Sequence, residues 1–576
     1  MRGRRHIAGF ARGPEHGSLH WMYLPTPTPD RYNLGVMIGQ TVSHSKSRQN
    51  SRGHNSSGRG GDPTFWTRTF ALRLGFILCL SGFWVVMHDQ GTTAAVPAAD
   101  LDPDERFVME TDQPVGTLSF EVIEGRSGVH LPSRLYFAYA DGRNDLPTVG
   151  RFENFLVTAS GREVKTLPVG EYDVYVSRGL EYTLAHHRIG IEEGKTTYLA
   201  STLELAIDTR GFISSDFHLH LMFAMRDGAI VSAAEGIDLL TATDHNILKD
   251  YAPYIKELSL ERFMQSVVGA EVDTSFGHFN SFPLELNPWD DREYRKAIQT
   301  PGEFLRLLRQ DPGDEITQIN HPRRQPEPNS TSGYFDGRLN RETSEFDYPY
   351  FESGFDQVEI FNALVDSPSE HIGRGALVDQ KLKDWYSLLN RGILITGVGN
   401  TDAHRYPTEL PGYPRNYVVS ETDNPWEIDP AKVVNALKNR ASTASFGPFV
   451  EFKANGAQVG SIITDRDGTV SLSVEVQAAP WIPVDNIEIV SNGKVIKTFS
   501  VEDVDPKERV RFAKDIIVQP TADAWYLVIA TSERRWEKPF ENFSSFSFTN
   551  PIFVDVDGNG YFDAPNSGHS VTPTDD

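Results

Sequence analysis

The chain has 576 residues, more than one hydrophobic core usually serves, so we expect several domains. Its 79 acidic and 55 basic side chains leave a net charge of −24, which disfavours a nucleic-acid partner because phosphate binding needs a basic face. The single cysteine, Cys79, excludes an intrachain disulfide framework and a thiolate cluster for a metal.

Residues 1–99 are predicted to be a disordered N-terminus that contains an export signal or a membrane anchor. Most of this segment is rich in Arg, Gly, Ser and Pro and cannot bury a core. The apolar stretch 74–87 follows Arg68 and Arg73, and it is shorter than the roughly 20 residues of a membrane helix. It fits the core of a signal peptide, with a small-residue cleavage site at 96–98. We therefore expect an extracytoplasmic protein, periplasmic or secreted; a retained N-terminal anchor and a buried helix are the alternatives.

Residues 100–210 show the period-two alternation of half-buried strands. Leu118, Phe120 and Val122 alternate with polar residues, and later segments repeat the pattern between glycine-containing turns. This pattern predicts an N-terminal β-sandwich. The segment contains no constellation of catalytic residues, so it either shapes the site of a neighbouring domain or acts as a spacer.

Residues 211–442 carry histidines and carboxylates at the ends of short apolar runs. Runs such as 316–319 and 393–398 are typical of strands buried on both faces, and 303–309 and 377–389 are predicted helices. Strand and helix in alternation favour a parallel α/β barrel or sheet, in which sites gather at the carboxyl ends of strands. The polar motifs are Asp216-Phe217-His218-Leu219-His220, Thr243-Asp244-His245-Asn246, Gly269-Ala270-Glu271, Gly277-His278-Phe279-Asn280, Asn320-His321-Pro322 and Asn400-Thr401-Asp402-Ala403-His404.

The residue types in these motifs indicate a metal site. Imidazole nitrogens and carboxylate oxygens bind Zn, Mn or Fe, and a histidine set without cysteines favours an open, catalytic site over a closed structural one. Each tripeptide alone is weak evidence for a metal site, because a single histidine at a strand end is more often a polar side chain with ordinary hydrogen-bond partners. The ordered set predicts metal binding.

In order and wording, these motifs resemble the PHP (polymerase and histidinol phosphatase) metallohydrolase superfamily, and more closely its CehA/McbA-like branch. The resemblance implies a multidomain α/β plus β protein: a distorted (β/α)7 barrel over 211–442, flanked by β-sandwich domains at 100–210 and 443–556. It also implies two or three divalent metal ions. The resemblance places His218, His220, Glu271 and Asp402 at one metal, and His321 at a second that Glu271 bridges, with His278 as a candidate further ligand. It places His245 and His404 at a third or shared position. Asp227, in the segment after His220, is an additional candidate ligand.

The segment after His220 departs from the family pattern. It is apolar where the family has a Ser-rich turn and another ligand, and only 230–235 remain for a helix. Asp227 is the one acidic residue placed to serve as that ligand. A lost third metal or a reshaped pocket is the alternative.

We expect hydrolysis by metal-bound hydroxide, with a second metal polarising the scissile bond. Asp402 would take the proton of the attacking water, and His404 or His245 would protonate the leaving group. A small molecule with an ester, carbamate or amide bond is the expected substrate. A PHP-type phosphoesterase and a catalytically impaired metal- or ligand-binding protein are the alternatives.

Three arginines near the motifs have two interpretations each. Arg323, Arg324 and Arg405 follow directly on ligand motifs and either bind an anionic group of the substrate or pair with surface carboxylates. Glu359, in the run 358–362, is interpreted as a residue that orients a ligand.

The C-terminal region is again rich in strands. A last helix is predicted at 429–438, a second β-sandwich at 443–556 and an acidic tail at 557–576. Residues 555–563 match the first nine positions of an EF-hand-like loop, which predicts a weak calcium site; an acidic turn is the alternative. The choice of metal, the substrate and the oligomeric state stay open.

Overall fold

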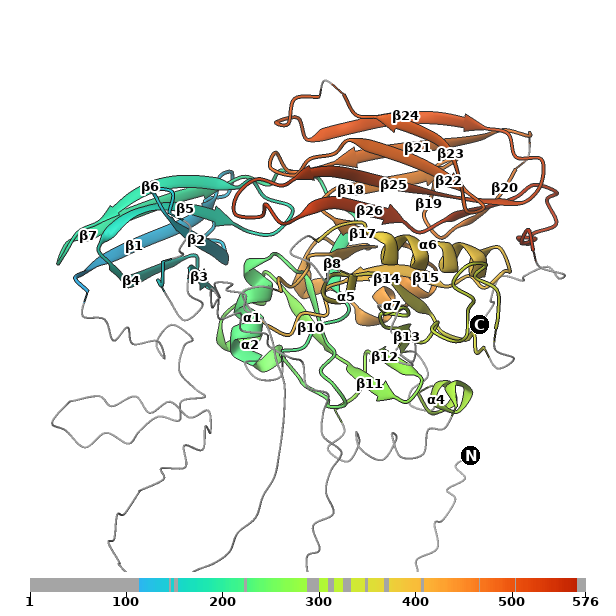
Figure 1. The fold of residues 1–576 in the computed structure, drawn as a ribbon, viewed down its shortest axis with the longest axis horizontal. Helices are drawn as coiled ribbons and strands as arrows, with labels where there is room; N and C mark the ends of the chain where they lie inside the picture. The colour runs from blue at the N-terminus through green and yellow to red at the C-terminus, as the bar shows by residue number, and fades with distance from the viewer. Residues whose placement is uncertain are drawn as a thin grey trace, which may run out of the picture. The chain divides into compact units, whose positions relative to one another are not determined.

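The computed structural model separates residues 1–81 from residues 82–576, and Figure 1 draws the described residues as a coloured ribbon. Everything described below belongs to residues 82–576. The described residues are 113–143, 147–149, 154–221, 225–286, 300–308, 315–324, 333–347, 351–366, 372–405, 409–465, 467–502 and 504–566. The predicted disordered N-terminus and signal segment at 1–99, and the last ten residues of the predicted acidic tail, lie outside them.

Seven N-terminal strands form two sheets that enclose one apolar core. The alternation predicted for the first strand is found, because Leu118, Phe120 and Val122 are buried in that core. One sheet has the order β4-β1-β7 and the other β3-β2-β5-β6. Their bounds are β1 Val115–Glu124, β2 Ser133–Tyr139, β3 Phe155–Thr158, β4 Arg162–Pro168, β5 Gly170–Ser177, β6 Ala185–Ile191 and β7 Thr196–Leu203.

The largest sheet has eleven strands and draws on both the middle and the end of the chain. Its main path is β10-β9-β8-β16-β17-β26-β25-β22-β23, with β27 pairing β25 and β20 pairing β27. The bounds are β8 Phe212–Asp216, β9 Leu239–Ala242, β10 Gln265–Val268, β16 Arg415–Val419, β17 Ser442–Phe446, β20 Ile462–Thr464, β22 Asn486–Ser491, β23 Lys494–Ser500, β25 Ala524–Arg535, β26 Ser544–Thr549 and β27 Ile552–Asp555. One sheet thus crosses the domain boundary expected at 442/443.

Two smaller sheets complete the strands. A five-stranded sheet has the order β11-β12-β13-β14-β15, and a four-stranded sheet has the order β19-β18-β21-β24. The first comprises β11 Ala270–Thr274, β12 Gly277–Phe282, β13 Ile316–Ile319, β14 Gln357–Asn362 and β15 Thr396–Asn400. The second comprises β18 Phe449–Ala454, β19 Ala457–Gln458, β21 Val470–Gln477 and β24 Val510–Val518.

Six α-helices lie within the described residues, and the longest, α6, packs on the central strands. Val378, Leu382 and Trp385 of α6 share a core with Val358 and Ile360 of β14. The helices are α1 Met225–Ala234, α2 Ala252–Glu257, α4 Pro301–Leu308, α5 Ala363–Asp366, α6 Ala376–Leu389 and α7 Pro430–Lys438, with a 3-10 turn η2 at Pro425–Glu427. The helices predicted at 303–309, 377–389 and 429–438 are confirmed within one or two residues at each end.

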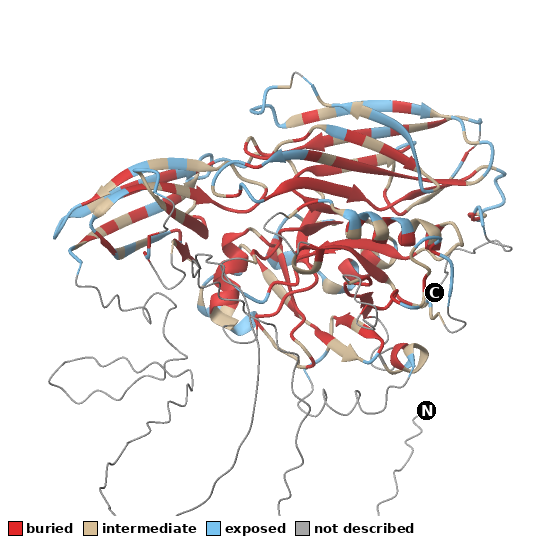
Figure 2. Ribbon diagram, in the orientation of Figure 1, coloured by how far each residue is buried: buried red, intermediate tan, exposed pale blue. Residues whose placement is uncertain are grey.

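The central strands are buried along their whole length. Figure 2 shows the ribbon of β14, β15 and β17 in the colour of buried residues, and every residue of these strands is buried. This burial explains the continuous apolar runs of the sequence, because a strand covered on both faces has no polar face to alternate with.

The expected (β/α)7 barrel is wrong, and of the two expected flanking β-sandwiches only the N-terminal one is found as two sheets around a core of their own. Strands β8 to β10 and β13 to β15 are parallel, but β8–β16, β11–β12 and β12–β13 are antiparallel, and the strands are divided between two sheets. The described residues are mostly strands, and the C-terminal strands continue the sheet of β8 instead of forming a domain of their own. The apolar runs predicted the strands, but burial does not fix the direction of a neighbour. Only two residues join β11 to β12, too few for a parallel crossover.

Candidate metal centre

The site is built where strands of the two central sheets end. His218 and His220 follow β8, His245 follows β9, His321 follows β13, and Asp402 and His404 follow β15; Glu271 and His278 lie on β11 and β12. Isolated bridges Leu219↔Ala403 and His245↔Glu271 connect the segments of one sheet to those of the other. These backbone contacts bring motifs from distant parts of the sequence into one place.

Glu271 is the centre of the cluster. Its Oε1 lies 3.2 Å from His218 Nε2, 3.2 Å from His278 Nδ1 and 3.3 Å from His321 Nε2. Its Oε2 lies 2.9 Å from His245 Nδ1 and 3.3 Å from His220 Nε2. One buried carboxylate is therefore surrounded by five imidazole rings, an arrangement in which it can bridge two cations.

Asp402 supplies the second carboxylate. Its Oδ1 lies 3.0 Å from His220 Nε2 and 3.2 Å from His218 Nε2, and its Oδ2 accepts a hydrogen bond of 3.2 Å from Asn362 Nδ2. His404 Nδ1 lies 2.7 Å from the backbone oxygen of Asp402. Asp402 thus belongs to the buried part of the cluster, and His404 to its edge.

Three groups of side chains in the described residues have ligand atoms that all lie within 4.8 Å of one another at this site. They are His218, His220, Glu271 and Asp402; His220, His245 and His404; and His245, Glu271, Asp273 and His278. His321 joins through Glu271. The structure thus brings together eight of the nine predicted ligands.

Asp227 belongs to none of these groups. It lies in the first turn of α1, which begins at Met225 and is longer than the helix expected at 230–235. The segment after His220 had suggested it as a ligand only by its position in the sequence. Because Asp227 is buried within the helix, it is the predicted ligand that the structure does not bring to the cluster.

Asp273 was missed by the sequence analysis. Its Oδ1 lies 2.9 Å from His245 Nδ1, and its Oδ2 accepts a hydrogen bond of 2.7 Å from Asn246 Nδ2. The signal was present, because Asp273 follows Glu271 by two residues on β11, and residues two apart face the same side of a strand.

Burial and charge act in opposite directions on the buried ionisable groups. Burial alone would lower the pKa of His218, but the neighbouring Asp402, Glu271 and Glu359 carboxylates raise it well above its ordinary value. Burial alone would raise the pKa of Glu271, but His218 and the other rings hold it well below its usual range. The carboxylates are therefore anionic. In the metal-free protein their charge is offset by neighbouring protonated imidazole rings such as that of His218.

His245 and His220 differ in whether burial or the neighbouring carboxylates has the larger effect on the pKa. Burial opposes protonation of both, yet hydrogen bonds to Asp273 and Glu271 raise the pKa of His245 to about 10. For His220 burial prevails and lowers the pKa to about 4. His220 is therefore a neutral imidazole at neutral pH, the form that coordinates a metal.

The donor set fits a divalent transition metal. It consists of imidazoles and carboxylates, and Nε2 of His220, which faces Glu271 and Asp402, is buried without a hydrogen-bond partner among the described residues. Buried polar atoms seldom lack a partner in folded proteins, and a bound ion can satisfy such an atom. A cation at the centre would also balance the carboxylates, whose charge is otherwise offset by protonated rings.

Three of the eight described non-glycine residues with positive φ lie at the same place. His321 has a φ of 24°, Asn246 of 55° and Asp402 of 57°, all in the left-handed region that residues other than glycine seldom adopt. Such conformations cost of order 1–3 kcal/mol and persist where surrounding structure enforces them, typically at functional sites. Each of these residues lies shortly after a strand and either is a predicted ligand or directly follows one.

The three arginines that follow ligand motifs have different surroundings. Arg323 is buried and binds Asp384 through Nε at 2.8 Å and Nη2 at 3.1 Å, so its role is structural. Arg405 is exposed and pairs with Glu409 at 3.1 Å. Arg324 instead lies against His321, with Nη2 3.0 Å from Nε2 of that ring.

The predicted calcium loop is closed by hydrogen bonds within itself and lies beside Asp523, a residue that the sequence did not indicate. Carboxylate oxygens of Asp523, Asp555 and Asp557 lie within 4.8 Å of one another. Oδ1 of Asp555 accepts hydrogen bonds from the backbone of Gly558 and Asn559. Calcium binding stays a prediction.

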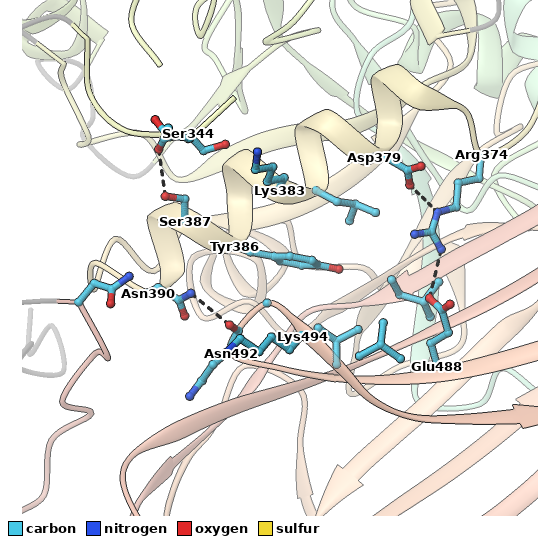
Figure 3. Close-up of a pocket in the computed structure, with 17 residues that line it drawn as sticks. Ser344, Arg374, Asp379, Lys383, Tyr386, Ser387, Asn390, Glu488, Asn492 and Lys494 are labelled. Atoms are coloured by element: carbon cyan, nitrogen blue, oxygen red, sulfur yellow. Dashed lines mark hydrogen bonds and ion pairs between the residues drawn. The ribbon is translucent and has the colours of Figure 1, made fainter. Parts of the chain in front are cut away.

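A pocket of about 400 Å³ lies apart from the cluster, between α6 and the hairpin of β22 and β23 (Figure 3). In it Arg374 reaches Asp379 on one side and Glu488 on the other. The aromatic ring of Tyr386 forms part of its wall. None of the predicted metal ligands lines this pocket.

No family model matches the chain, and no curated protein matches it. Among solved structures, the chain is similar to GBS52, the minor pilin of Streptococcus agalactiae, with 18% identity and a TM-score of 0.14 over 16% of this chain and 45% of the pilin. The chain thus covers less than half of that protein's length. A DUF3823 family protein from Bacteroides uniformis matches with 7% identity and a TM-score of 0.14, over 77% of this chain and 100% of that one. Neither likeness carries an argument about fold or function.

None of the helices in the described part of the chain has the length and apolar character needed to cross a bilayer.

Proposed function

We propose that the chain is a metal-dependent hydrolase that acts on an ester, carbamate or amide bond of a small molecule. One observation carries the proposal: ligand atoms of His218, His220, Glu271 and Asp402, all buried, lie within 4.8 Å of one another. Two imidazoles and two carboxylates at this spacing match the ligands of catalytic Zn, Mn or Fe.

The residues of the cluster suggest two metal positions that share Glu271. His218, His220 and Asp402 would hold one ion with it; His245, Asp273 and His278 lie around its other side. A bound divalent ion would lower the pKa of a water molecule from 15.7 to about 7 and polarise the scissile oxygen.

The exposed edge of the cluster is where a substrate would enter. The side chains of His245 and His404 are 32% and 35% exposed, whereas those of His218, His220 and His321 are at most 2% exposed. Nε2 of His404 lies 3.3 Å from Nε2 of His245, so the two partly exposed rings are adjacent at this edge.

Roles for these side chains follow from their positions. Asp402, kept anionic by His218 and His220 against the effect of burial on its pKa, would accept the proton of the attacking water. His404 donates its Nδ1–H to the backbone oxygen of Asp402, which directs Nε2 toward His245; with a second proton on Nε2, the ring would deliver that proton to the leaving group and return to the neutral form. His245 is the alternative donor.

A phosphoesterase is the second candidate, and Arg324 beside His321 is the observation that favours it. A catalytically impaired binding protein is the third, favoured by the absence of Asp227 from the ligand groups of the described residues. Membership of the PHP superfamily stays a prediction that rests on the motifs alone, because the described residues do not form the barrel that it implies.

We also propose that the protein acts outside the cytoplasm. The support is the apolar stretch 74–87 after Arg68 and Arg73, which has the length of a signal-peptide core. Cleavage of this stretch and its retention as an anchor predict different N-termini, which sequencing the N-terminus of the secreted or membrane-bound protein distinguishes.

The test is metal content and hydrolysis measured on the same preparations. Elemental analysis of the purified full chain should find two or more equivalents of a transition metal, and fewer in His218→Ala and Asp402→Asn. Hydrolysis of an aryl ester should fall by about 10²–10⁴-fold in Asp402→Asn. His186→Ala, which changes an exposed ring paired with Asp173, is the matched control and should keep both metal and activity. One equivalent or none, unaffected by the variants, would refute the proposal in favour of the binding protein.

A further inference from the structure

The inference concerns Arg324 and rests on the proposed function. Its Nη2 lies 3.0 Å from Nε2 of His321 and its Nε lies 3.3 Å from Nδ1 of the same ring. A neutral imidazole has one lone pair, so it can accept only one of these contacts as a hydrogen bond. A guanidinium has five N–H donors, and no carboxylate pairs with Arg324 among the described residues.

This position is unlike that of the other cations near the site. Arg323 directs its donors to Asp384, Asp336 and the backbone of Leu339, and Arg405 directs its donors to Glu409. Of these three arginines, Arg324 therefore carries the charge that the described part of the chain leaves without an anionic partner.

The backbone holds Arg324 at the cluster. Its N–H donates to Oδ2 of Asp336 at 3.1 Å, and its carbonyl accepts from Nη2 of Arg341 at 3.1 Å. The positive φ of His321 begins the turn that folds the side chain back over that ring. The backbone of Arg324 is thus anchored on both sides, and its guanidinium lies against the ring of His321.

The guanidinium also adjoins the ligands themselves. Nε2 of His321, the atom 3.0 Å from Arg324, is the atom that lies 3.3 Å from Oε1 of Glu271. If Nε2 of His321 ligates a metal, its lone pair is used, and Arg324 must direct its donors to another acceptor. A carboxylate or phosphate matches the fork of a guanidinium through two parallel hydrogen bonds.

We propose that Arg324 binds an anionic group of the substrate, so that the enzyme selects esters or amides that carry a carboxylate or phosphate close to the scissile bond. Arg324 is then a specificity-determining residue, and Arg323 and Arg405 are not.

Two matched esters test the selection. The 4-nitrophenyl esters of butyric acid and of succinic acid have four-carbon acyl groups, and the second ends in a carboxylate. The full-length, metal-loaded protein should hydrolyse the succinate monoester with the higher kcat/KM. Arg324→Gln should lower the ratio of the two kcat/KM values at least tenfold, and Arg324→Lys should lower it less, because an ammonium keeps the charge but not the fork. Arg405→Gln is the control and should leave the ratio unchanged.

Binding gives a readout that does not depend on turnover. Succinate, followed by calorimetry, should bind at least tenfold more weakly to Arg324→Gln than to the unaltered chain. If neither ester is hydrolysed but this difference is found, the proposed ester hydrolysis fails and the anion site stands. An equal ratio and equal succinate affinity in both proteins would overturn the inference. If Arg324→Gln loses activity only toward 4-nitrophenyl phosphate, the group that Arg324 binds is the phosphoryl group that is cleaved, and selection of anionic esters is refuted.

Discussion

Nδ1 of His218 donates a hydrogen bond to Oε1 of Glu359 at 3.0 Å, and both side chains are fully buried. This contact fixes the orientation of the ring and leaves Nε2 toward Glu271 and Asp402, each 3.2 Å away. A carboxylate behind a histidine ligand makes the ring more basic and holds it in place. Glu359 also accepts from the backbone N–H of His321 at 2.6 Å, so it supports two ligands at once.

Glu359→Gln should weaken metal binding by about 10–100-fold without unfolding the protein. The amide keeps the shape of the side chain but loses the charge that strengthens His218 as a ligand. Competition with a chromogenic chelator measures the affinity. Glu541→Gln, a change at an exposed side chain, is the control; equal affinity in both variants would contradict the role of Glu359.

Asp273→Asn should lower the pKa of His245 by about 1 or more, because the variant removes a negative charge 2.9 Å from Nδ1. Histidine NMR titration of the metal-free protein measures this value, which is raised to about 10 in the unaltered chain. The exposed Asp515 on β24 provides the control Asp515→Asn, which should leave the resonance of His245 unchanged. If the pKa of His245 is unchanged in Asp273→Asn, the effect is assigned to Glu271 and the role of Asp273 is contradicted.

Metal binding at pH 7 should release protons. The carboxylates raise the pKa of His218 and of His245 above the ordinary value near 6.5, so both rings are protonated in the metal-free chain. A ring must lose its proton to become a ligand, and metal affinity should therefore increase with pH. Adding Mn²⁺ or Zn²⁺ in weak buffer with a pH indicator should show more than one proton released per chain. Binding without release would exclude these two rings as ligands.

The metal-free fold should become less stable as the pH rises. The folded-state pKa of His245 is raised to about 10, so the stabilisation from its protonated ring is complete below its ordinary pKa of about 6.5 and is lost as the pH rises through about 10. The Tm of protein treated with a chelator should fall over this window. Bound metal replaces the protons on the rings, so the Tm of the metal-loaded protein should fall less over the same pH range. Equal pH profiles for the two forms would contradict the prediction.

Arg134→Met should destabilise the protein by about 3–5 kcal/mol, because it leaves Glu235 as a buried charge without its partner. Nε of Arg134 on β2 lies 2.5 Å from Oε1 of Glu235, which follows α1, and both side chains are 0% exposed. The double variant Arg134→Met/Glu235→Gln should recover part of the loss in denaturant titrations. Removing the exposed pair of Lys432 and Glu421 should leave the midpoint unchanged.

Sequence patterns predicted secondary structure well where apolar residues recur at the spacing of a strand or of a helix. The alternation at Leu118, Phe120 and Val122 reports one face of β1, and the apolar face of residues 377–389 becomes α6. Strand direction was not predictable in this way. The residue pattern of β12 is the same whether the neighbouring strand is parallel or antiparallel. The two-residue turn that joins β11 to β12 makes this pair antiparallel.

By itself the sequence determined the chemistry of the candidate site: imidazoles and carboxylates, no thiolate, each following or lying on a buried strand. Tertiary structure decided which of these side chains meet. It added Asp273 and left Asp227 in α1, and it separated Arg324 from Arg323 although the two are neighbours in the chain. The physical reason is that ligand type is a property of one residue, whereas a distance depends on backbone contacts between distant segments, here Leu219↔Ala403 and His245↔Glu271.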